Sequence, residues 1–266
     1  MSTVTEQHGE QRGEQDSAAG AGESALEIAG LQAWYGESHI LHGVDLSVKR
    51  GEVVTLLGRN GAGRTTTLRA IMGLTGRRTG SIRIGARETI QMPTYRIAHC
   101  GVGYCPEERG IFSSLSCEEN LLLPPAIGAK SGVKGGAKSG EQGMSLDEIY
   151  SMFPNLAERR HSQGTRLSGG EQQMLAVARI LRTGANLLLL DEISEGLAPV
   201  IVQTLARMIV TLKSRGYTVV MVEQNFRFAA PLADRFYVME HGRIVERFGI
   251  AELEGKMPVL HDLLGV

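Results

Sequence analysis

A glycine-rich stretch at 58–66 (GRNGAGRTT) constrains the fold of this chain more than any other feature. It matches the phosphate-loop pattern G-x-x-x-x-G-K-[ST], except that Arg64 stands where the pattern has lysine. The apolar run at 53–57 before it predicts a buried strand, and residues 67–72 after it predict a helix. Because strand, glycine loop and helix together form a phosphate cradle, the sequence predicts a nucleoside triphosphate site.

Each residue type in this loop has a chemical purpose. Successive backbone N–H groups and the following helix N-terminus bind phosphate oxygens, and the Thr65 hydroxyl is predicted to coordinate Mg²⁺. A glycine-rich turn alone is also compatible with a plain loop, but the flanking strand and helix favour nucleotide binding. The predicted ATP-binding residues of the loop are Gly58, Asn60, Gly61, Gly63, Arg64, Thr65 and Thr66.

Length and composition narrow the function classes. A chain of 266 residues suffices for one large domain or one domain with a lobe. Its formal net charge of −1 argues against a general nucleic-acid binder. No apolar stretch approaches the roughly 20 residues that cross a bilayer, and the N-terminus lacks a signal-peptide pattern. Three cysteines without zinc spacing favour a cytosolic chain with reduced thiols.

The chain divides into a tail and one ordered domain. Residues 1–24 are poor in apolar side chains and are predicted to be disordered, and 25–266 are predicted to form the domain. A helical lobe is expected at roughly 113–183, interrupted by a Gly/Lys-rich segment at about 128–143. The lysines of that segment suggest contact with phosphate or acidic headgroups, but its glycines favour a solvated flexible loop.

The second half of the chain alternates helices and strands. This alternation predicts an α/β fold with a mostly parallel central sheet covered on both faces. Strands are expected at 26–35, 46–48, 53–57, 81–84, 102–105, 187–190, 218–222 and 235–239.

Two carboxylates, Asp191 and Glu192, follow the apolar strand at 187–190. The strand brings them to the carboxyl edge of the sheet, where ligands of open α/β sheets bind. We expect Asp191 to hold Mg²⁺ through water and Glu192 to orient or deprotonate the attacking water. Taken alone, the pair is equally compatible with a helix N-cap.

A second anion-binding turn stands shortly before these carboxylates. It consists of Leu167, Ser168, Gly169, Gly170 and Glu171, and it opens a predicted helix through 174–181. One sheet edge cannot present both this turn and the loop at 58–66 to the same phosphate. Here the chain resembles the ATP-binding subunits of ABC transporters, in which the LSGG turn of one subunit closes on the partner's nucleotide. The resemblance covers about residue 26 to the C-terminus.

The resemblance implies a P-loop NTPase ABC ATPase fold with an antiparallel β subdomain and a small helical signature lobe. It also assigns roles to single residues: Tyr35 stacks on adenine, although a core aromatic is the alternative. Glu107 takes the Q-loop position beside the metal, and Gln224 takes the switch-histidine position in catalysis. The segment 194–198 corresponds to the D-loop that crosses the dimer. ATP and Mg²⁺ are the implied cofactors.

Three short sequence motifs narrow the resemblance to one group of ABC ATPases. The wording PEERGIF at 106–112, SEGLAP at 194–199 and VEQN at 222–225 is similar to LivF-type ATPases of branched-chain amino-acid importers, a family with urea and short-amide relatives. Such a subunit lies at the cytoplasmic face of the inner membrane and binds no nucleic acid. Its implied partners are a LivG-type sister ATPase or a second copy in a head-to-tail dimer, membrane-spanning permease subunits and, indirectly, a periplasmic binding protein. A groove near 107–112 is expected to receive a cytoplasmic helix of the permease.

The departures from the family pattern gather in the half that grips this chain's own nucleotide. They are Arg64 for lysine, Glu107 for glutamine, Gln224 for histidine and Ile193 for proline, whereas the turn at 167–170 is intact. We therefore hypothesise an asymmetric dimer whose Arg64 site turns over slowly. The alternatives are a nucleotide-binding clamp without turnover, and a soluble ABC protein of DNA or the ribosome. The last class usually carries a coiled coil or tandem ATPase domains, which this chain lacks.

Overall fold

The computed structural model describes residues 23–125 and 143–265. Residues 1–22 of the predicted disordered tail lie outside the described residues. The same holds for the predicted Gly/Lys loop, apart from its last residue, 143. The first described strand begins at Ser24, two residues before the predicted start.

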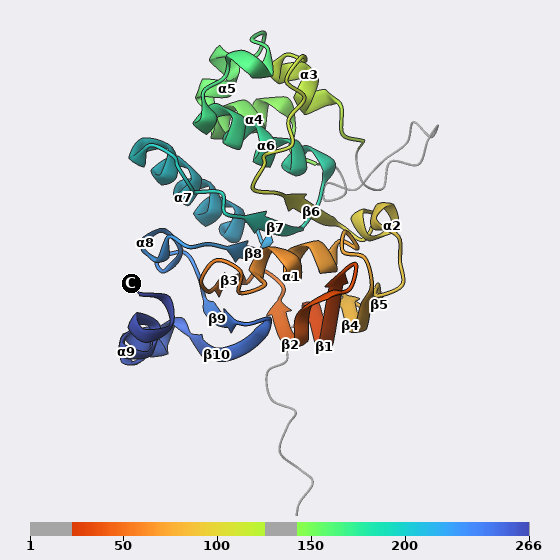
Figure 1. Cartoon of the computed structure of the whole chain (residues 1–266). Coiled ribbons are helices and arrows are strands. Elements are labelled where there is room, and N and C mark those ends of the chain that lie inside the picture. Colours follow the sequence, from red (N-terminus) through yellow and green to blue (C-terminus); the bar gives the residue numbers. More distant parts are fainter. Residues whose placement is uncertain (1–22, 126–142, 266) are drawn as a thin grey trace, which may run out of the picture.

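A six-stranded sheet forms the centre of the described chain, in the strand order β10-β9-β3-β8-β7-β6 (Figure 1). Neighbours from β9 to β6 are parallel, and β10 is antiparallel to β9. β3, β7 and β8 are buried at every residue, which explains why their sequences are continuous apolar runs. The prediction of a mostly parallel central sheet is confirmed. The strands are β3 (Val53–Leu57), β6 (Val102–Cys105), β7 (Leu187–Asp191), β8 (Thr218–Val222), β9 (Arg235–Glu240) and β10 (Arg243–Gly249).

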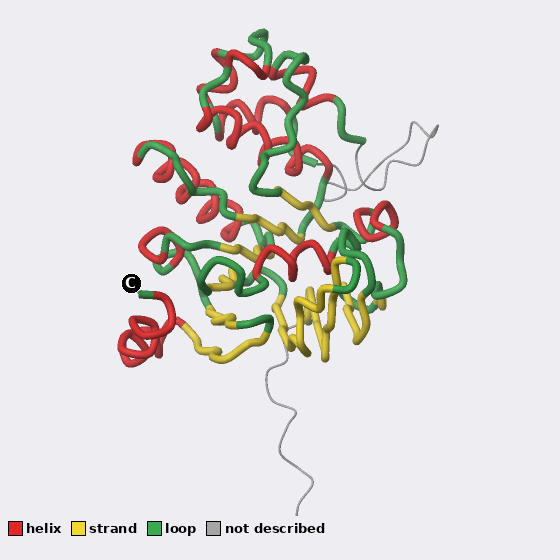
Figure 2. Tube along the Cα trace, in the orientation of Figure 1, coloured by secondary structure: helices red, strands yellow, loops and turns green. Residues whose placement is uncertain are grey.

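A second, antiparallel sheet packs over one face of the first with helix α1 (Arg64–Ile71) in the same buried cluster (Figure 2). Its strand order is β2-β1-β4-β5, and β1 pairs with both β2 and β4. Leu68 of α1, Val54 of β3 and Leu26 of β1 belong to this one cluster, so the phosphate-loop helix is held from both sides. The strands are β1 (Ser24–Tyr35), β2 (Ser38–Lys49), β4 (Arg78–Ile84) and β5 (Arg87–Glu88).

The opposite face of the parallel sheet packs against α6 (Gly169–Thr183) and α7 (Pro199–Ser214). Side chains of α6 also pack into the helical lobe, so this helix belongs to both parts of the core. Helix α2 (Thr94–Ala98) precedes β6, and α8 (Phe226–Ala229) and α9 (Leu253–Leu264) lie near the far edge of the sheet with β10 (Figure 1).

The helical lobe consists of short segments. They are α3 (Cys117–Leu122), α4 (Leu146–Met152), α5 (Pro154–Glu158) and a 3₁₀ turn at Gly164–Arg166. Capping boxes begin α3 and α4, at Ser116 and Ser145. Helix α4 ends at its C-cap, Phe153, because Pro154 lacks the N–H that would continue it and instead begins α5.

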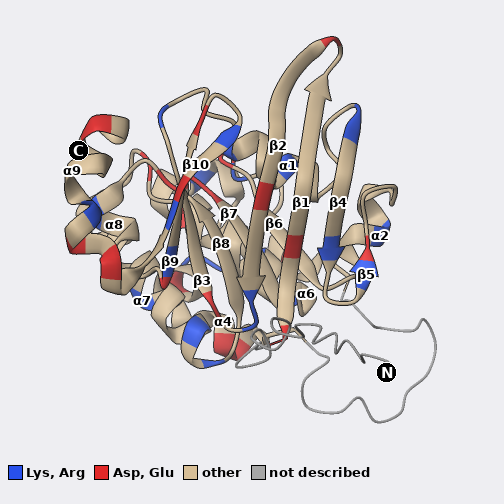
Figure 3. Cartoon of the chain, turned by 90° about the horizontal axis from the view of Figure 1, so that it is seen from below, with Lys and Arg blue, Asp and Glu red and all other residues tan. Residues whose placement is uncertain are grey.

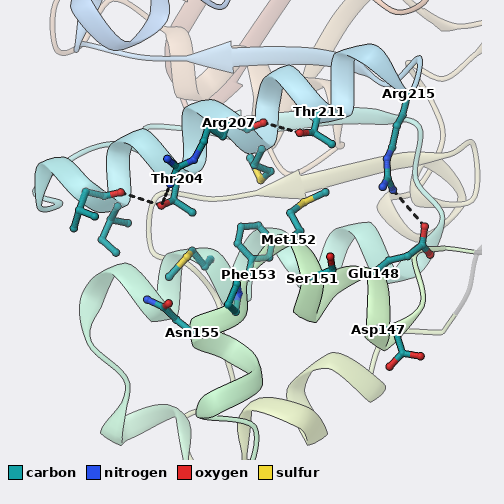
Figure 4. A pocket seen from close by; sticks show the side chains of 15 residues that line it. Asp147, Glu148, Ser151, Met152, Phe153, Asn155, Thr204, Arg207, Thr211 and Arg215 are labelled. Carbon is teal, nitrogen blue, oxygen red and sulfur yellow. Dashed lines mark hydrogen bonds and ion pairs between the residues drawn. The ribbon is translucent and has the colours of Figure 1, made fainter.

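The lobe meets α7 across a cleft of ≈ 860 Å³ (Figure 4). An ion pair between Arg215 and Glu148, with 3.3 Å between Nη1 and Oε1, spans this cleft and joins α7 to α4. Along the ribbon seen from below, positions of Lys or Arg and positions of Asp or Glu occur on several of the same elements (Figure 3).

Close packing of β6 against α6 depends on Gly103. A Cβ at Gly103 would lie 1.8 Å from Cγ2 of Ile180 and 3.1 Å from Cβ of Ala185. We expect Gly103→Ala to lower the free energy of unfolding by about 1–3 kcal/mol through overpacking. The measurement is urea denaturation of the purified chain.

The matched control is Gly255→Ala in α9, where a Cβ meets no atom within 4 Å among the described residues. A helix-interior glycine replaced by alanine should raise stability by roughly 0.5–1 kcal/mol. Equal stability changes for the two variants would contradict the packing described here.

Candidate functional site

The phosphate loop joins β3 to α1 in a conformation that only glycine tolerates at two positions. Gly58 has φ 157° and Gly63 has φ 102°. A Cβ at Gly58 would lie 2.5 Å from the carbonyl oxygen of Met239, and one at Gly63 would lie 2.9 Å from Cδ2 of Leu41. Substitution at either position therefore requires displacement of its neighbours.

A pocket of ≈ 460 Å³ opens above this loop at the carboxyl edge of the parallel sheet. It brings together the end of β1, the loop, and the segments that follow β6, β7 and β8. The structure thus assembles most of the predicted nucleotide site in one place. The pocket is lined by Tyr35, Ile40, Asn60, Gly61, Ala62, Gly63, Arg64, Thr65, Thr66, Glu107, Glu192, Glu195 and Gln224.

Arg64 is the first residue of α1 and forms a buried ion pair with Glu192. The distance between Nη2 and Oε1 is 2.9 Å, and the two side chains are 4% and 7% exposed. The other terminal nitrogen, Nη1, is buried without a hydrogen-bond partner among the described residues. A buried N–H donor without an acceptor is costly, and a phosphate oxygen in the pocket would satisfy it. The loop therefore fits a nucleotide phosphate.

Thr65 and Asp191 fit the predicted metal site. Thr65 Oγ1 donates to Asp191 Oδ1 at 2.9 Å, and the Tyr104 hydroxyl donates to Asp191 Oδ2 at 3.0 Å. Burial raises the pKa of Asp191 above its usual value, and these two hydrogen bonds oppose that shift. A hydroxyl beside a carboxylate is a suitable oxygen pair for Mg²⁺. Glu107, the third predicted ligand, lines the pocket and is exposed.

Glu192 directly follows β7 and has a left-handed backbone, with φ 49°. Its N–H donates to the carbonyl of Val222 at 2.8 Å. Gln224 Nε2 lies 3.2 and 3.0 Å from the two Glu192 oxygens, and 2.6 Å from Asn60 Oδ1. Burial raises the pKa of Glu192, and the Arg64 guanidinium opposes that shift. The two predicted catalytic residues are therefore in direct contact.

The turn at 167–171 lies outside the lining of this pocket. Ser168 caps α6: its Oγ accepts from the Glu171 N–H at 3.3 Å, and its own N–H donates to the Glu171 carboxylate at 2.7 Å. Gly170 packs closely on α7, because a Cβ there would lie 2.7 Å from Ile201 Cγ1. Ser168 is exposed, so the predicted signature turn is presented on the surface of the lobe.

Several residues of this region were not predicted from the sequence. Glu223 is 1% exposed and accepts from Ser194 N–H at 3.2 Å and from Ser194 Oγ–H at 2.7 Å. Arg109 donates to Gln172 and Gln173 of α6, at 3.1 and 3.2 Å. Glu223 directly follows the apolar strand β8, so the signal that pointed to Asp191 could also have pointed to Glu223.

The segment after β6 connects two parts of the molecule. Glu108 pairs with Arg69 of α1 at 3.0 Å, while Arg109 binds α6. Glu107, between Pro106 and this pair, lines the pocket. Side-chain contacts therefore join the segment that borders the pocket to α1 on one side and to α6, which begins at the turn 167–171, on the other.

Comparison with known proteins identifies the family. The model of the ABC transporter family matches residues 41–195. The chain belongs to this family. It is 41% identical over 215 residues to the high-affinity branched-chain amino acid transport ATP-binding protein BraG of Pseudomonas aeruginosa, covering 81% of this chain and 88% of that one.

Two further relatives agree. A probable branched-chain amino acid transport ATP-binding protein LivF of Archaeoglobus fulgidus is 32% identical over 220 residues, covering 82% of this chain and 89% of that one. A nucleotide-free ATP-binding cassette from an ABC transporter shares the fold with a TM-score of 0.73 at 22% identity, covering 87% of this chain and 94% of that one. The predicted family and fold class are therefore confirmed. No helix within the described ranges is long and apolar enough to cross a membrane.

The buried Glu223 of this ABC subunit makes stability depend on pH. Burial raises the pKa of Glu223 from 4.5 to about 7. A raised pKa in the folded state means that the proton stabilises the fold below pH 4.5, and that this stability is lost as the pH rises through about 7. Glu223→Gln removes this loss, so the variant should gain up to about 3 kcal/mol over the wild type between pH 5 and pH 8.

The measurement is urea denaturation of both proteins at pH 5 and pH 8. Groups far from this position titrate alike in both proteins, so the difference between them reports Glu223 together with its effect on the neighbouring Glu192. A stability difference that is the same at both pH values would contradict the assignment.

Proposed function

We propose that this ABC subunit binds and hydrolyses ATP to power the import of branched-chain amino acids or related small polar solutes such as urea and amides. The observation that supports hydrolysis is the pocket lined by the phosphate loop and Glu192, with the buried Asp191 hydrogen-bonded to Thr65 of the loop. The solute class follows from the similarity to BraG, whose name records branched-chain amino acid transport.

Each pocket residue has a proposed task. Loop N–H groups and the free Nη1 of Arg64 bind the phosphates, and Tyr35 stacks on adenine. Thr65, Asp191 and Glu107 hold Mg²⁺, which neutralises charge on the phosphates when it is bound. Glu192 orients the attacking water and accepts its proton, while Gln224 holds the Glu192 carboxylate in place.

The exposed signature turn supports a dimer. Since 167–171 lies outside this chain's own pocket, we propose that it closes on the nucleotide of a partner ATPase. The partner is a LivG-type sister subunit or a second copy in head-to-tail arrangement, and the segment 194–198 crosses between the two. This assembly sits on permease subunits at the cytoplasmic face of the inner membrane, fed by a periplasmic binding protein.

The Arg64–Glu192 ion pair supports a slow site. The Arg64 guanidinium pairs with the proposed base, Glu192, through Nη2 and is proposed to bind phosphate through Nη1. A lysine ammonium is a single point charge and lacks this planar fork, so it would not hold both groups in the same geometry. A loss of roughly 3–4 kcal/mol of transition-state stabilisation corresponds to two to three decades in rate. The same ion pair favours a second candidate function, in which Arg64 abolishes turnover and the subunit acts as an ATP-gated clamp beside an active partner.

A groove of ≈ 560 Å³ between α2, β6 and α6 is the proposed seat of the permease's cytoplasmic helix. Leu74 and Tyr95 on its wall are 48% and 63% exposed, so both offer apolar surface to a partner helix. The groove also contains Pro106 and Arg109, so it adjoins the segment that links the nucleotide pocket to α6.

Arg64→Lys tests the slow-site proposal in the assembled transporter. If Arg64 limits a competent site, single-turnover ATP hydrolysis at this chain's own site should rise by about 100–1,000-fold, because two to three decades correspond to about 3–4 kcal/mol of barrier. The control adds Glu192→Gln to Arg64→Lys, which should remove the gain. Unchanged turnover in Arg64→Lys, together with equal single-turnover rates at the two sites, would rule out the asymmetric arrangement.

Tyr95→Ala tests the proposed permease groove. Loss of this exposed aromatic should weaken recovery of the chain with the membrane subunits by about 10-fold, since large aromatics dominate such contacts. Nucleotide binding by the purified chain should not change. Val245→Ala on β10, an exposed apolar residue outside the groove lining, is the matched control. Equal recovery of the two variants would reject the groove.

A further inference from the structure

The residues that follow β7 run through an unfavourable backbone conformation. Glu192 has φ 49°, which side chains other than glycine, asparagine and aspartate rarely adopt. The next two residues are buried: Ile193 is 1% and Ser194 is 4% exposed. Such a conformation persists only when the surrounding structure holds it from several directions.

Three consecutive residues at the end of β8 supply these contacts. The Val222 carbonyl accepts the Glu192 N–H at 2.8 Å, and Gln224 donates to the Glu192 carboxylate at 3.0 and 3.2 Å. Between them, Glu223 accepts both the N–H and the hydroxyl of Ser194. The backbone at Glu192 is thus held by its own N–H bond to β8 and, two residues later, by the bonds between Ser194 and Glu223.

Among the described residues, the Glu223 side chain forms hydrogen bonds only with Ser194. This side chain is buried, and the Ser194 N–H and hydroxyl are the two donors to its carboxylate. It forms no ion pair among the described residues. A buried carboxylate without a paired cation destabilises a fold and calls for an explanation beyond packing.

We propose that Glu223 is a positioning residue for hydrolysis. By fixing Ser194, it keeps Glu192 in its left-handed conformation, with the carboxylate facing the nucleotide pocket, and it sets the direction in which 194–198 leaves the sheet. Gln224 orients the Glu192 side chain, but Glu223 orients the backbone that carries it. This inference rests on the proposed role of Glu192 as the base.

Two substitutions at the same position separate positioning from packing. In Glu223→Gln, the amide oxygen still accepts the Ser194 N–H and the amide nitrogen donates to the Ser194 hydroxyl, so the turn is retained. In Glu223→Leu, the side chain keeps a similar volume and suits a buried site, but both contacts are lost. Ser194→Ala removes the hydroxyl contact from the other side with little loss of volume. Glu240→Leu, at the exposed end of β9, is the control for loss of a strand-end carboxylate.

The first readout is hydrogen exchange of the backbone amides across 191–198 in the purified full chain. We expect exchange in Glu223→Leu to be at least about 10-fold faster than in the wild type, because the Ser194 amide loses its acceptor. Glu223→Gln and Glu240→Leu should exchange like the wild type. Unchanged exchange in Glu223→Leu would overturn the proposal.

The second readout is ATP hydrolysis and Mg-ATP affinity of the same proteins assembled with their partner. Glu223→Leu should lower kcat by roughly 10–100-fold with KM for ATP within about 3-fold, and Ser194→Ala should shift in the same direction by a smaller factor. Glu223→Gln should retain turnover within about 3-fold. Equal damage in the Gln and Leu variants, or a loss of affinity and thermal stability matching the loss of kcat, would show a charge effect or a structural role and reject positioning.

These readouts distinguish the inference from the proposed function. Faster exchange in Glu223→Leu in a chain whose wild type does not hydrolyse ATP would support the positioning contact and reject hydrolysis at this site. Wild-type exchange in Glu223→Leu, in a chain whose wild type hydrolyses ATP normally, would reject the positioning contact and support hydrolysis at this site.

Discussion

The parallel pairing of β3, β7 and β8 is the constraint on which the site depends. Leu56 of β3 and Asp191 of β7 are both in register with Val222 of β8, so the three strands end at one level. The phosphate loop, the carboxylate pair and the Glu223 segment leave the sheet there as neighbours, although more than 100 residues separate Arg64 from Glu192 in sequence. Because each strand is buried on both faces, a shift of register would expose apolar side chains and would also separate these groups.

Burial makes the charges of this edge depend on one another. Asp191, Glu192 and Glu223 are three buried carboxylates, and Arg64 is a buried cation among them. Burial raises the pKa of each of these acids, and hydrogen bonds from Thr65, Gln224 and Ser194 oppose the shift. The cluster holds three acidic groups and one cation, so it offers bound phosphates little positive charge of its own. Loop N–H groups, the helix N-terminus and Mg²⁺ are the further sources of positive charge that such a site offers.

The sequence predicts those parts whose signals are local. Continuous apolar runs located β3 and β8 to the residue, and the loop pattern located the pocket. β10 and α9 were missed, because alternating charges in Arg243–Gly249 weaken the strand signal and Pro258 interrupts the pattern of α9. The start of β2 at Ser38 was missed because the hydrophobic pattern of β2 is irregular in its first half. That half is a strand because it pairs with β1 across a tight turn.

The contacts that give the site its character are not local. The Arg64–Glu192 ion pair joins residues 128 positions apart, and the contact between Glu223 and Ser194 spans 29. Neither follows from residue types alone, because both depend on how three strand ends are placed relative to one another. Departures such as Arg64 can be found in the sequence, but their effect on Glu192 becomes clear only once the strands are paired.

The two surfaces of the chain that we propose contact nucleotide are held by different means, and this difference bears on asymmetry. The phosphate loop depends on the parallel sheet and on close contacts of Gly58 and Gly63 with β9 and β2. The signature turn depends on its own capping box and on Gly170 packing against α7. A change at Arg64 therefore alters the chain's own pocket without disturbing the turn. In the proposed dimer, such a change lowers turnover at one site and leaves the subunit able to complete the site of its partner.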